Sequence, residues 1–557
     1  MPRGPARHRV ESRHRMSSLK PLAAIALVLA LLWALLTWPQ AAQMQSVPDE
    51  GDPLLNAWAL SWVAHETPIA PARLAHANIF FPERYTLLYS ESLILPGLLL
   101  APLQWVGVNP VVVYNVGMAL GMILSGLGVA LLVLELTGDA WAALVAAIAF
   151  AFLPFRFDHY WHMQLQQTAC VPLALWALHR WYRRGAMRDG VWLGLCVAGQ
   201  FYACVYFGVL LLPVLAAVAL VYAVALGGTL RMRLTATLAA LLVCGVVVAP
   251  LGSAYLRATR IVGERSRDEA LAGSAHLTDY LAAPRNSRLY AAATQGWGGE
   301  ERRLFPGLTV VALAGIGLWR RRALVPWAYA AALVVAVDVS LGFHGISYAA
   351  LFKTVGLFRG IRVPARMGLL VGFALAVLAA FGVQRLRDLL RPSWLRQLLP
   401  VAACVAIVVE SSGTPIGLSR VPETEPPGYA DLRRDAQGTP TAVVADLPLT
   451  ASMPTFMYYS TFHWQQLLTG YSGFFPPSYF ALARDLEQFP DASALDALRA
   501  RQTRYVVLHG EVYPPEQFAA LAAKADASPA LVLVSRTPWR GGEMRVYRLR
   551  PSARETL

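Results

Sequence analysis

The sequence predicts an α-helical membrane protein that crosses the bilayer about eleven times and ends in a soluble α/β domain. Hydrophobic residues make up 56% of the 557 residues and charged residues only 15%, which lies well outside the range of soluble proteins. Long apolar runs recur from residue 21 to residue 411 and then stop, and short arginine-rich connections separate several of them. Together these features indicate a polytopic membrane domain followed by a water-soluble one.

The first apolar run follows an arginine-rich tail at residues 1–20. The run extends from Leu22 to Trp38 and is long enough to span the bilayer as a helix. A basic flank is retained in the cytoplasm, so we interpret the run as a signal anchor with a cytoplasmic N-terminus. The chain after Trp38 is then expected outside the cytoplasm.

One assignment of spans keeps all the arginine clusters on the cytoplasmic side. It requires that the short apolar stretch Leu93–Val106, which contains Pro96, Gly97 and Pro102, is a re-entrant or interfacial helix and not a crossing. The predicted spans are 21–39, 110–135, 139–155, 168–181, 189–206, 208–227, 233–256, 304–319, 324–342, 367–384 and 396–411. The predicted membrane domain is therefore 21–411, with extracytoplasmic loops at 40–109, 156–167, 257–303 and 343–366.

The net charge of +14 follows this topology. Arginines in short cytoplasmic loops are the positive-inside signal, so the basicity does not indicate a nucleic-acid partner. The clusters are Arg180, Arg183, Arg184 and Arg188; Arg320 to Arg322; and Arg385, Arg387, Arg391 and Arg396.

From Ser412 onward the hydrophobicity falls, and residues 412–557 are predicted to form an extracytoplasmic α/β domain. Short β-rich runs alternate with helical patterns. The expected strands are Thr441–Leu447, Arg504–His509, Ala530–Ser535 and Met544–Leu549, and the expected helices are Tyr479–Phe489, Ala492–Arg501 and Pro515–Ala525.

Three carboxylates follow the first span, at Asp49, Glu50 and Asp52. The next residues, Leu54–Glu66, have the pattern of an amphipathic helix lying along the interface, with Leu54, Trp58 and Trp62 on one face. Asp52 precedes Pro53, so it could instead be the N-cap of that helix. For Asp49 and Glu50 the alternative is plain solvent exposure.

The carboxylate-bearing loop Pro48–Glu50, the helix after it and about eleven spans resemble the GT-C superfamily of membrane glycosyltransferases. The segments Gly51–Trp58, Asn78–Pro82 and Arg362–Arg366 are similar to a group of uncharacterised bacterial GT-C-like membrane proteins, as is Gly470–Phe474.

The resemblance implies transfer of a sugar from a polyprenyl-phosphate carrier to a glycan, lipid or protein acceptor outside the bacterial inner membrane. It also implies that an aspartate of the first loop acts as general base, with Asp49 favoured, Asp52 next and Glu50 beside them.

The loop between the third and fourth spans is dense in polar and aromatic groups. Its candidate residues are Asp158, His159, His162 and Gln164. The resemblance implies a second acid here, which Asp158 matches by position. Asp158 with His159 or His162 could also bind a divalent metal, although no third ligand is evident. The alternative is interfacial anchoring by Tyr160 and Trp161, with the histidines simply hydrated.

Arg359, Arg362 and Arg366 are predicted outside the cytoplasm, against the general charge rule. Guanidinium groups can hold phosphate oxygens bidentately and stabilise the charge that develops on a leaving group. We therefore expect these arginines to bind the phosphate of the carrier, with lipid headgroups as the alternative.

Two other functions fit the same helices. A transporter or flippase of lipid-linked sugars is expected to have repeated halves, and the sequence contains no evident repeat. An inactive GT-C-like scaffold would not depend on Asp49. A glycosyltransferase that uses a polyprenyl-phosphate sugar is the function we expect.

Overall fold

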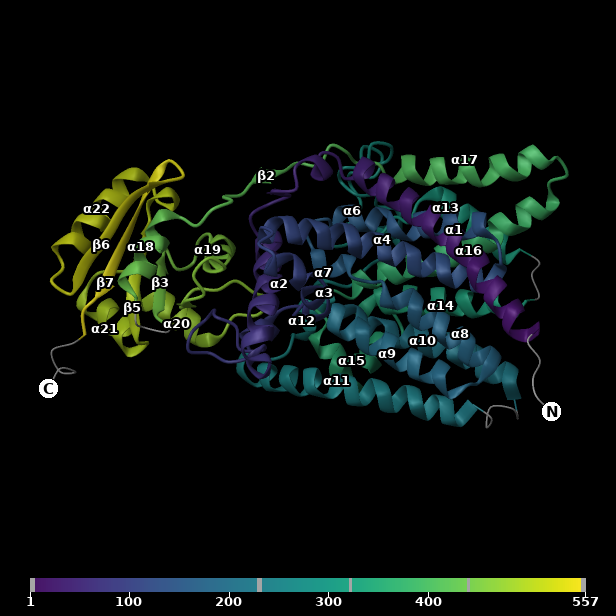
Figure 1. Ribbon diagram of the computed structural model, residues 1–557, viewed down its shortest axis with the longest axis horizontal. Coiled ribbons are helices and arrows are strands. Elements are labelled where there is room, and N and C mark those ends of the chain that lie inside the picture. The colour runs from purple at the N-terminus through teal and green to yellow at the C-terminus, as the bar shows by residue number, and fades with distance from the viewer. Residues whose placement is uncertain (1–5, 228–232, 320–322, 438–440, 552–557) are drawn as a thin grey trace. The chain divides into compact units, whose positions relative to one another are not determined.

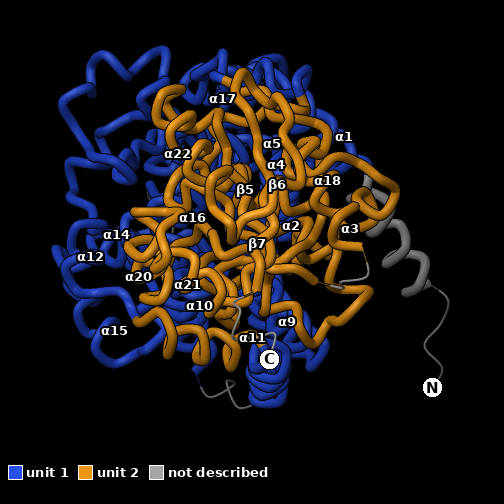
Figure 2. Tube along the Cα trace, turned by 90° about the vertical axis from the view of Figure 1, so that its left-hand side faces the viewer, with its two compact units in different colours: residues 1–43, 116–250, 264–417 blue, residues 44–115, 251–263, 418–557 orange. Residues whose placement is uncertain are grey.

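The computed structural model describes residues 6–227, 233–319, 323–437 and 441–551. The predicted arginine cluster at 320–322 lies outside the described residues. The chain forms two compact units, which Figure 2 colours separately. The first comprises residues 1–43, 116–250 and 264–417, and the second comprises residues 44–115, 251–263 and 418–557.

The first unit is built from helices, and each predicted span coincides with a helical segment (Figure 1). The helices of the predicted spans, two of which continue into the second unit, are α1 (Ala6–Leu36), α4 (Pro110–Thr137), α5 (Ala140–Ala151), α8 (Cys170–Arg184), α9 (Met187–Ala203), α10 (Val205–Leu226), α11 (Leu234–Val262), α13 (Leu308–Leu318), α14 (Leu324–Ser340), α16 (Gly368–Leu389) and α17 (Ser393–Ser411). Two short helices, α6 (Pro154–Asp158) and α7 (Met163–Gln166), occupy the loop between α5 and α8.

Six helical segments of the described chain are long and apolar enough to cross a membrane. They are Pro110–Thr137, Ala140–Asp158, Val205–Leu226, Leu234–Val262, Pro364–Leu389 and Ser393–Ser411. Helices α13 and α14 and residues Lys20–Leu36 of α1 are apolar but shorter. The structure thus supports a multi-pass membrane protein, and the count of eleven spans stays a prediction.

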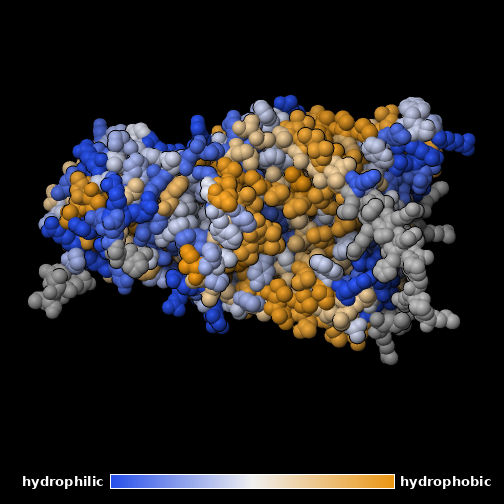
Figure 3. Space-filling model, viewed as in Figure 1, coloured by the Kyte–Doolittle hydropathy of each residue, from blue (hydrophilic) through white to orange (hydrophobic). Residues whose placement is uncertain are grey.

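Burial distinguishes inner from outer helices. The segment Pro364–Leu389 contains α16, and 94% of the residues in its most apolar stretch are buried. In the most apolar stretch of α11 only 17% of the residues are buried. Helix α11 exposes large apolar side chains along its length, among them Leu238, Leu242 and Val246. Figure 3 shows extensive apolar surface over the helices, including the lower edge where Figure 1 shows α11. Such a surface is expected where a helix faces lipid.

Helices α13 and α16 approach closely through glycines. A Cβ atom at Gly382 would lie 2.0 Å from the carbonyl oxygen of Leu313, and one at Gly317 would lie 2.2 Å from that of Leu378. Small residues that allow backbones to approach are typical of helix contacts in membranes. The pair therefore determines how these two helices pack.

The second unit contains a five-stranded mixed sheet of order β4-β3-β5-β7-β6. The strands are β3 (Val443–Leu447), β4 (Gln466–Leu467), β5 (Thr503–His509), β6 (Leu531–Trp539) and β7 (Gly542–Leu549), and β4, β3 and β5 are parallel whereas β7 is antiparallel to β5 and β6. Helices α18 (Pro427–Asp435), α19 (Met453–Ser460), α20 (Pro477–Asp485), α21 (Ala492–Ala500) and α22 (Pro515–Ala527) connect or cover the strands (Figure 1).

Residues 44–115 belong to this same unit. Strand β1 (Ser46–Val47) pairs with β2 (Ser419–Arg420). The chain around Asn78 also runs beside β4, because Leu467 N–H donates to the Asn78 carbonyl and Phe81 N–H donates to the Leu467 carbonyl. The sequence-based prediction instead assigns the loop 40–109 to the membrane domain 21–411.

The helix expected at Leu54–Glu66 exists as α2 (Asp52–Ile69), but its apolar face does not face lipid. Leu54, Trp58 and Trp62 are buried, because protein covers the apolar face. The Trp58 indole donates to Asn78 Oδ1 at 3.1 Å, and α19 packs against the helix. The helix within Leu93–Val106 is α3 (Ile94–Trp105), whose 12 residues cannot cross a hydrocarbon core of about 30 Å.

Candidate active site

The first-loop carboxylates lie at the start of α2. Asp49 Oδ1 accepts a hydrogen bond of 2.7 Å from Gly51 N–H, which holds the carboxylate against the backbone at the helix N-terminus. A Cβ atom at Gly51 would lie 2.8 Å from this oxygen, so a larger residue would crowd the turn. The turn therefore fixes the direction of the Asp49 side chain.

Asp52 does not cap the helix, so the N-cap alternative is wrong. The N-cap is Gly51, and Asp52 is the first helical residue. Its Oδ1 accepts a hydrogen bond of 3.1 Å from the Tyr471 hydroxyl. A carboxylate in the first turn is also stabilised by the positive end of the helix dipole.

Glu50 forms an ion pair with Arg540, so plain solvent exposure is wrong for this residue. The guanidinium Nη1 and Nη2 atoms donate to the two carboxylate oxygens at 3.0 and 2.8 Å. Arg540 lies in the turn between β6 and β7 with φ of 46°. The hydrogen bonds that Arg540 donates to Glu50 raise the pKa of Arg540 above its ordinary value. Sequence reasoning missed Arg540, which no local motif marks.

A second cluster, in the first unit, surrounds Glu301. Arg366 donates to both carboxylate oxygens, from Nε at 2.8 Å and from Nη2 at 2.5 Å, and Arg362 Nη2 lies 3.7 Å away. The Arg366 guanidinium also lies over the Tyr206 ring at 5.2 Å, and the Tyr206 hydroxyl accepts the Val363 N–H at 2.6 Å. The structure thus brings two of the three predicted arginines together around one acid.

The charge of Glu301 is strongly stabilised. Burial alone opposes ionisation, but the charge and hydrogen bonds of Arg366 outweigh it and hold the pKa of Glu301 well below its usual range. Glu301 is therefore a carboxylate at any physiological pH. Sequence reasoning missed this acid, and Tyr206 with it.

Arg359 lies apart from these contacts. It donates to the carbonyl oxygens of Phe352 and Lys353 at 3.4 and 3.3 Å and pairs with Glu264 at 3.5 Å. These interactions do not involve Glu301. Arg362 and Arg366 are therefore the better phosphate candidates.

His159 lies beside Glu301, with Nδ1 at 3.7 Å from Oε2. The side chain is 2% exposed, and within the described chain neither ring nitrogen has a hydrogen-bond partner. Burial lowers the pKa of His159 to about 3, so the imidazole is neutral. Gln166 Nε2 donates to the His159 carbonyl at 3.0 Å, which links α7 to the turn that follows α6.

The other residues predicted in this loop are spread out. Asp158 Oδ1 accepts from Arg285 N–H at 3.4 Å, the His162 ring lies 5.7 Å from that of His159, and Gln164 is buried. Trp161 is exposed, but Tyr160 is buried at 3%, so interfacial anchoring is wrong for Tyr160.

The residues do not fit a divalent metal. No three His, Cys, Asp or Glu side chains are arranged to hold a metal ion in the part of the chain that the structure describes. This arrangement argues against the metal site considered for Asp158 and the neighbouring His159 and His162.

The fold is similar to that of solved GT-C glycosyltransferases. The arabinofuranosyltransferase AftD from Mycobacteria aligns with 95% of this chain at a TM-score of 0.61 and 14% identity. Two further structures align at TM-scores below 0.5: ArnT from Cupriavidus metallidurans (0.48, 13% identity, 96% of this chain and 98% of that one) and the Archaeoglobus fulgidus oligosaccharyltransferase (0.47, 14% identity, 88% and 69%). The GT-C fold predicted from the sequence is confirmed.

This chain spans 41% of the length of the arabinofuranosyltransferase. No protein-family model matches the sequence, and no curated protein matches it.

Proposed function

We propose that this protein is a membrane glycosyltransferase that takes a sugar from a polyprenyl-phosphate carrier and transfers it to an acceptor hydroxyl outside the cytoplasm. The observation that carries the proposal is the likeness to an arabinofuranosyltransferase over 95% of the chain at a TM-score of 0.61. The acceptor is a glycan, a lipid or a protein of the cell envelope, and the membrane is the inner membrane of a bacterium.

Asp49 is the general base of this proposal. Its carboxylate is oriented by the hydrogen bond that it accepts from the Gly51 N–H. Glu50 is neutralised by Arg540, and Asp52 accepts a hydrogen bond from Tyr471. A carboxylate held in this direction can take the proton of the acceptor hydroxyl as the hydroxyl oxygen attacks the anomeric carbon.

Arg362 and Arg366 bind the carrier phosphate. Arginine recognises carboxylate and phosphate with the same bidentate geometry, so Glu301 occupies the place that a phosphate oxygen pair would take. Arg362, whose side chain is half exposed, is accessible to the incoming phosphate. The two guanidinium groups then stabilise the charge that develops on the phosphate as the sugar leaves.

The test is transfer by the purified full-length protein from polyprenyl-phosphate sugars to acceptors in a membrane extract. Asp49→Asn keeps the side-chain oxygen that accepts the Gly51 N–H and removes only the base, so transfer should fall about 100- to 10,000-fold. Asp52→Asn keeps the side-chain oxygen that accepts the Tyr471 hydroxyl, so its transfer should fall less than that of Asp49→Asn. Asp485→Asn, an exposed acid of α20, is the matched control and should transfer normally. Normal transfer by Asp49→Asn would exclude the proposed base.

A further inference from the structure

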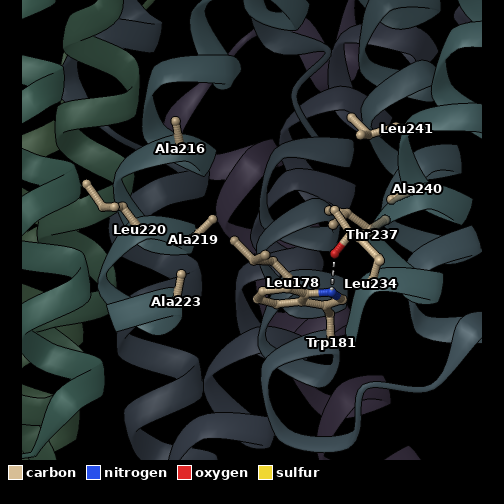
Figure 4. Close-up of a pocket in the computed structure, with 11 residues that line it drawn as sticks. Leu178, Trp181, Ala216, Ala219, Leu220, Ala223, Leu234, Thr237, Ala240 and Leu241 are labelled. Carbon is tan, nitrogen blue, oxygen red and sulfur yellow. Dashed lines mark hydrogen bonds between the residues drawn. The ribbon is translucent and has the colours of Figure 1, made fainter. Parts of the chain in front are cut away.

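Helices α8, α9, α10 and α11 line an open cavity of about 510 Å³ in the first unit, within the usual size range of ligand pockets. Figure 4 shows its lining, which comprises Leu178, Trp181, Leu193, Ala216, Ala219, Leu220, Ala223, Leu234, Thr237, Ala240 and Leu241. The lining side chains are apolar except at Trp181 and Thr237, and these two satisfy each other, because the Trp181 indole donates to Thr237 Oγ1 at 3.1 Å. The cavity therefore suits a hydrocarbon and needs no polar ligand.

The cavity lies far from the proposed phosphate site. Helix α10 begins next to Tyr206, which binds the backbone of Val363, and the lining residues of α10 begin at Ala216 and end at Ala223. At a rise of about 1.5 Å per residue, the lining residues of α10 therefore lie about 15 to 25 Å from Tyr206 along the helix. Helix α8 repeats this arrangement, since it starts after the His159 loop and lines the cavity with Leu178 and Trp181 near its end.

Four arginines lie where α8 ends and α9 begins, next to the cavity. Two of them form ion pairs, and two have none among the described residues. Arg180 pairs with Asp189 at 3.0 Å, and Arg183 pairs with Glu135 at 2.9 Å. Arg184, in the last turn of α8, and Arg188, in the first turn of α9, are exposed, and neither has a partner among the described residues. Free cations beside an apolar cavity complement a lipid with an anionic headgroup.

We propose that this cavity binds a hydrocarbon chain of an anionic phospholipid, with the headgroup on Arg184 and Arg188. The lipid comes from the leaflet that the arginine cluster faces. Lipid tails in the bilayer are as apolar as the cavity wall, so the wall selects for shape and gives little preference between lipids. The two arginines must then supply the preference for an anionic headgroup. The distance from Arg362 and Arg366 means that a polyprenyl-phosphate donor bound there cannot also place its phosphate on Arg184 and Arg188, so the two headgroup sites are separate.

The test is native mass spectrometry of the purified full-length protein, titrated with phosphatidylglycerol and phosphatidylcholine. Wild type should retain phosphatidylglycerol in preference to phosphatidylcholine. Arg184→Gln with Arg188→Gln should weaken phosphatidylglycerol binding about 10- to 30-fold and leave phosphatidylcholine unchanged, since each basic residue near a membrane surface contributes about fivefold. Arg391→Gln, an exposed arginine of another loop in the same unit, is the matched control and should have no such effect.

A second variant tests the cavity itself. Ala219→Trp fills the space and should abolish the retained lipid, whereas Ala402→Trp on the exposed face of α17 should not. Equal lipid retention by wild type and Ala219→Trp, or equal loss on Arg391→Gln, would overturn the proposal. Displacement of phosphatidylglycerol by polyprenyl phosphate would overturn it too. None of these measurements depends on sugar transfer.

Discussion

Arg366 donates two hydrogen bonds to Glu301, at 2.8 and 2.5 Å, so the guanidinium that we assign to the donor phosphate is already occupied by a carboxylate. The Arg366 side chain is 9% exposed and that of Glu301 is 16% exposed. An arginine buried to this degree needs an anion beside it. Glu301 supplies that anion, so the proposed donor phosphate would have to displace it.

Glu301→Gln tests this exchange. Removing the carboxylate leaves Arg366 and Arg362 without their counter-ion, so the variant should unfold at a lower temperature than wild type. Polyprenyl phosphate should then stabilise Glu301→Gln more than wild type, because no internal anion competes, and the KM for the donor should fall severalfold. Thermal unfolding with and without polyprenyl phosphate measures both effects. If Glu301→Gln instead binds donor as weakly as Arg366→Gln does, Glu301 only positions the arginine.

The predicted topology can be tested by labelling single added cysteines in whole cells. Ile346 is 94% exposed and belongs to the loop 343–366 that we place outside, whereas Arg391 belongs to a predicted cytoplasmic loop. A membrane-impermeant maleimide should label Ile346→Cys in intact cells and Arg391→Cys only after lysis. The wild-type chain, with its five native cysteines, gives the background. The reverse pattern would refute the assignment that puts the arginine clusters inside.

The positions of helices could be predicted from the sequence because apolar runs and arginine-rich ends are local signals. The partners in the site could not. Glu301 is 65 residues from Arg366, and Glu50 is 490 residues from Arg540, so nothing near either acid in the sequence marks its partner.

The error at Asp52 has a different physical cause. Aspartate before proline is a strong capping signal, but Gly51 takes the N-cap position and leaves the Asp52 carboxylate for Tyr471. The expectation that the apolar face of α2 meets the membrane also arose from a local pattern. The apolar face with Trp58 suits a membrane interface, and only the folded unit shows that Asn78 and α19 cover it.

Two glycines of α13 offer a matched test of helix packing. Gly317→Val would put a Cβ atom 2.2 Å from the Leu378 carbonyl oxygen, whereas at Gly315 a Cβ atom meets nothing within 4 Å. Overpacking of this kind costs about 1–3 kcal/mol or more, so Gly317→Val should lower the unfolding temperature in detergent and the yield of monodisperse protein. Gly315→Val changes the same residue type in the same helix and should behave like wild type. Equal destabilisation by both would mean that helix propensity, not contact with α16, is responsible.

The ion pair between Glu50 and Arg540 can be measured by a double-mutant cycle. The two side chains are about one third exposed, so their coupling should be modest, about 0.5–1 kcal/mol in unfolding free energy. Glu50→Gln and Arg540→Gln should each lower transfer activity, because both release the loop that carries Asp49, and the double variant should be no worse than either single one. Fully additive losses in kcat/KM would show that the two residues act separately.

His509 should make the stability of the second unit depend on pH. Its Nε2 lies 3.1 Å from Asp446 Oδ1 and its Nδ1 lies 3.2 Å from Glu511 Oε1, and the Tyr429 hydroxyl donates to the same Asp446 oxygen. Burial opposes the charge on the imidazole, but the two carboxylates outweigh it and raise the pKa of His509 to about 9.

Because the folded pKa exceeds the ordinary value of about 6.5, this protonation stabilises the fold fully below pH 6.5 and is lost as the pH rises through 9. Hydrogen exchange in β5, corrected for intrinsic rates, should therefore accelerate between pH 7 and 9.5 in the wild-type chain. His509→Gln should be less stable at pH 6.5 and should lose most of this pH dependence, whereas the matched variant His276→Gln in the first unit should retain it. A wild-type β5 with the same protection at pH 6.5 and 9.5 would contradict a charged His509.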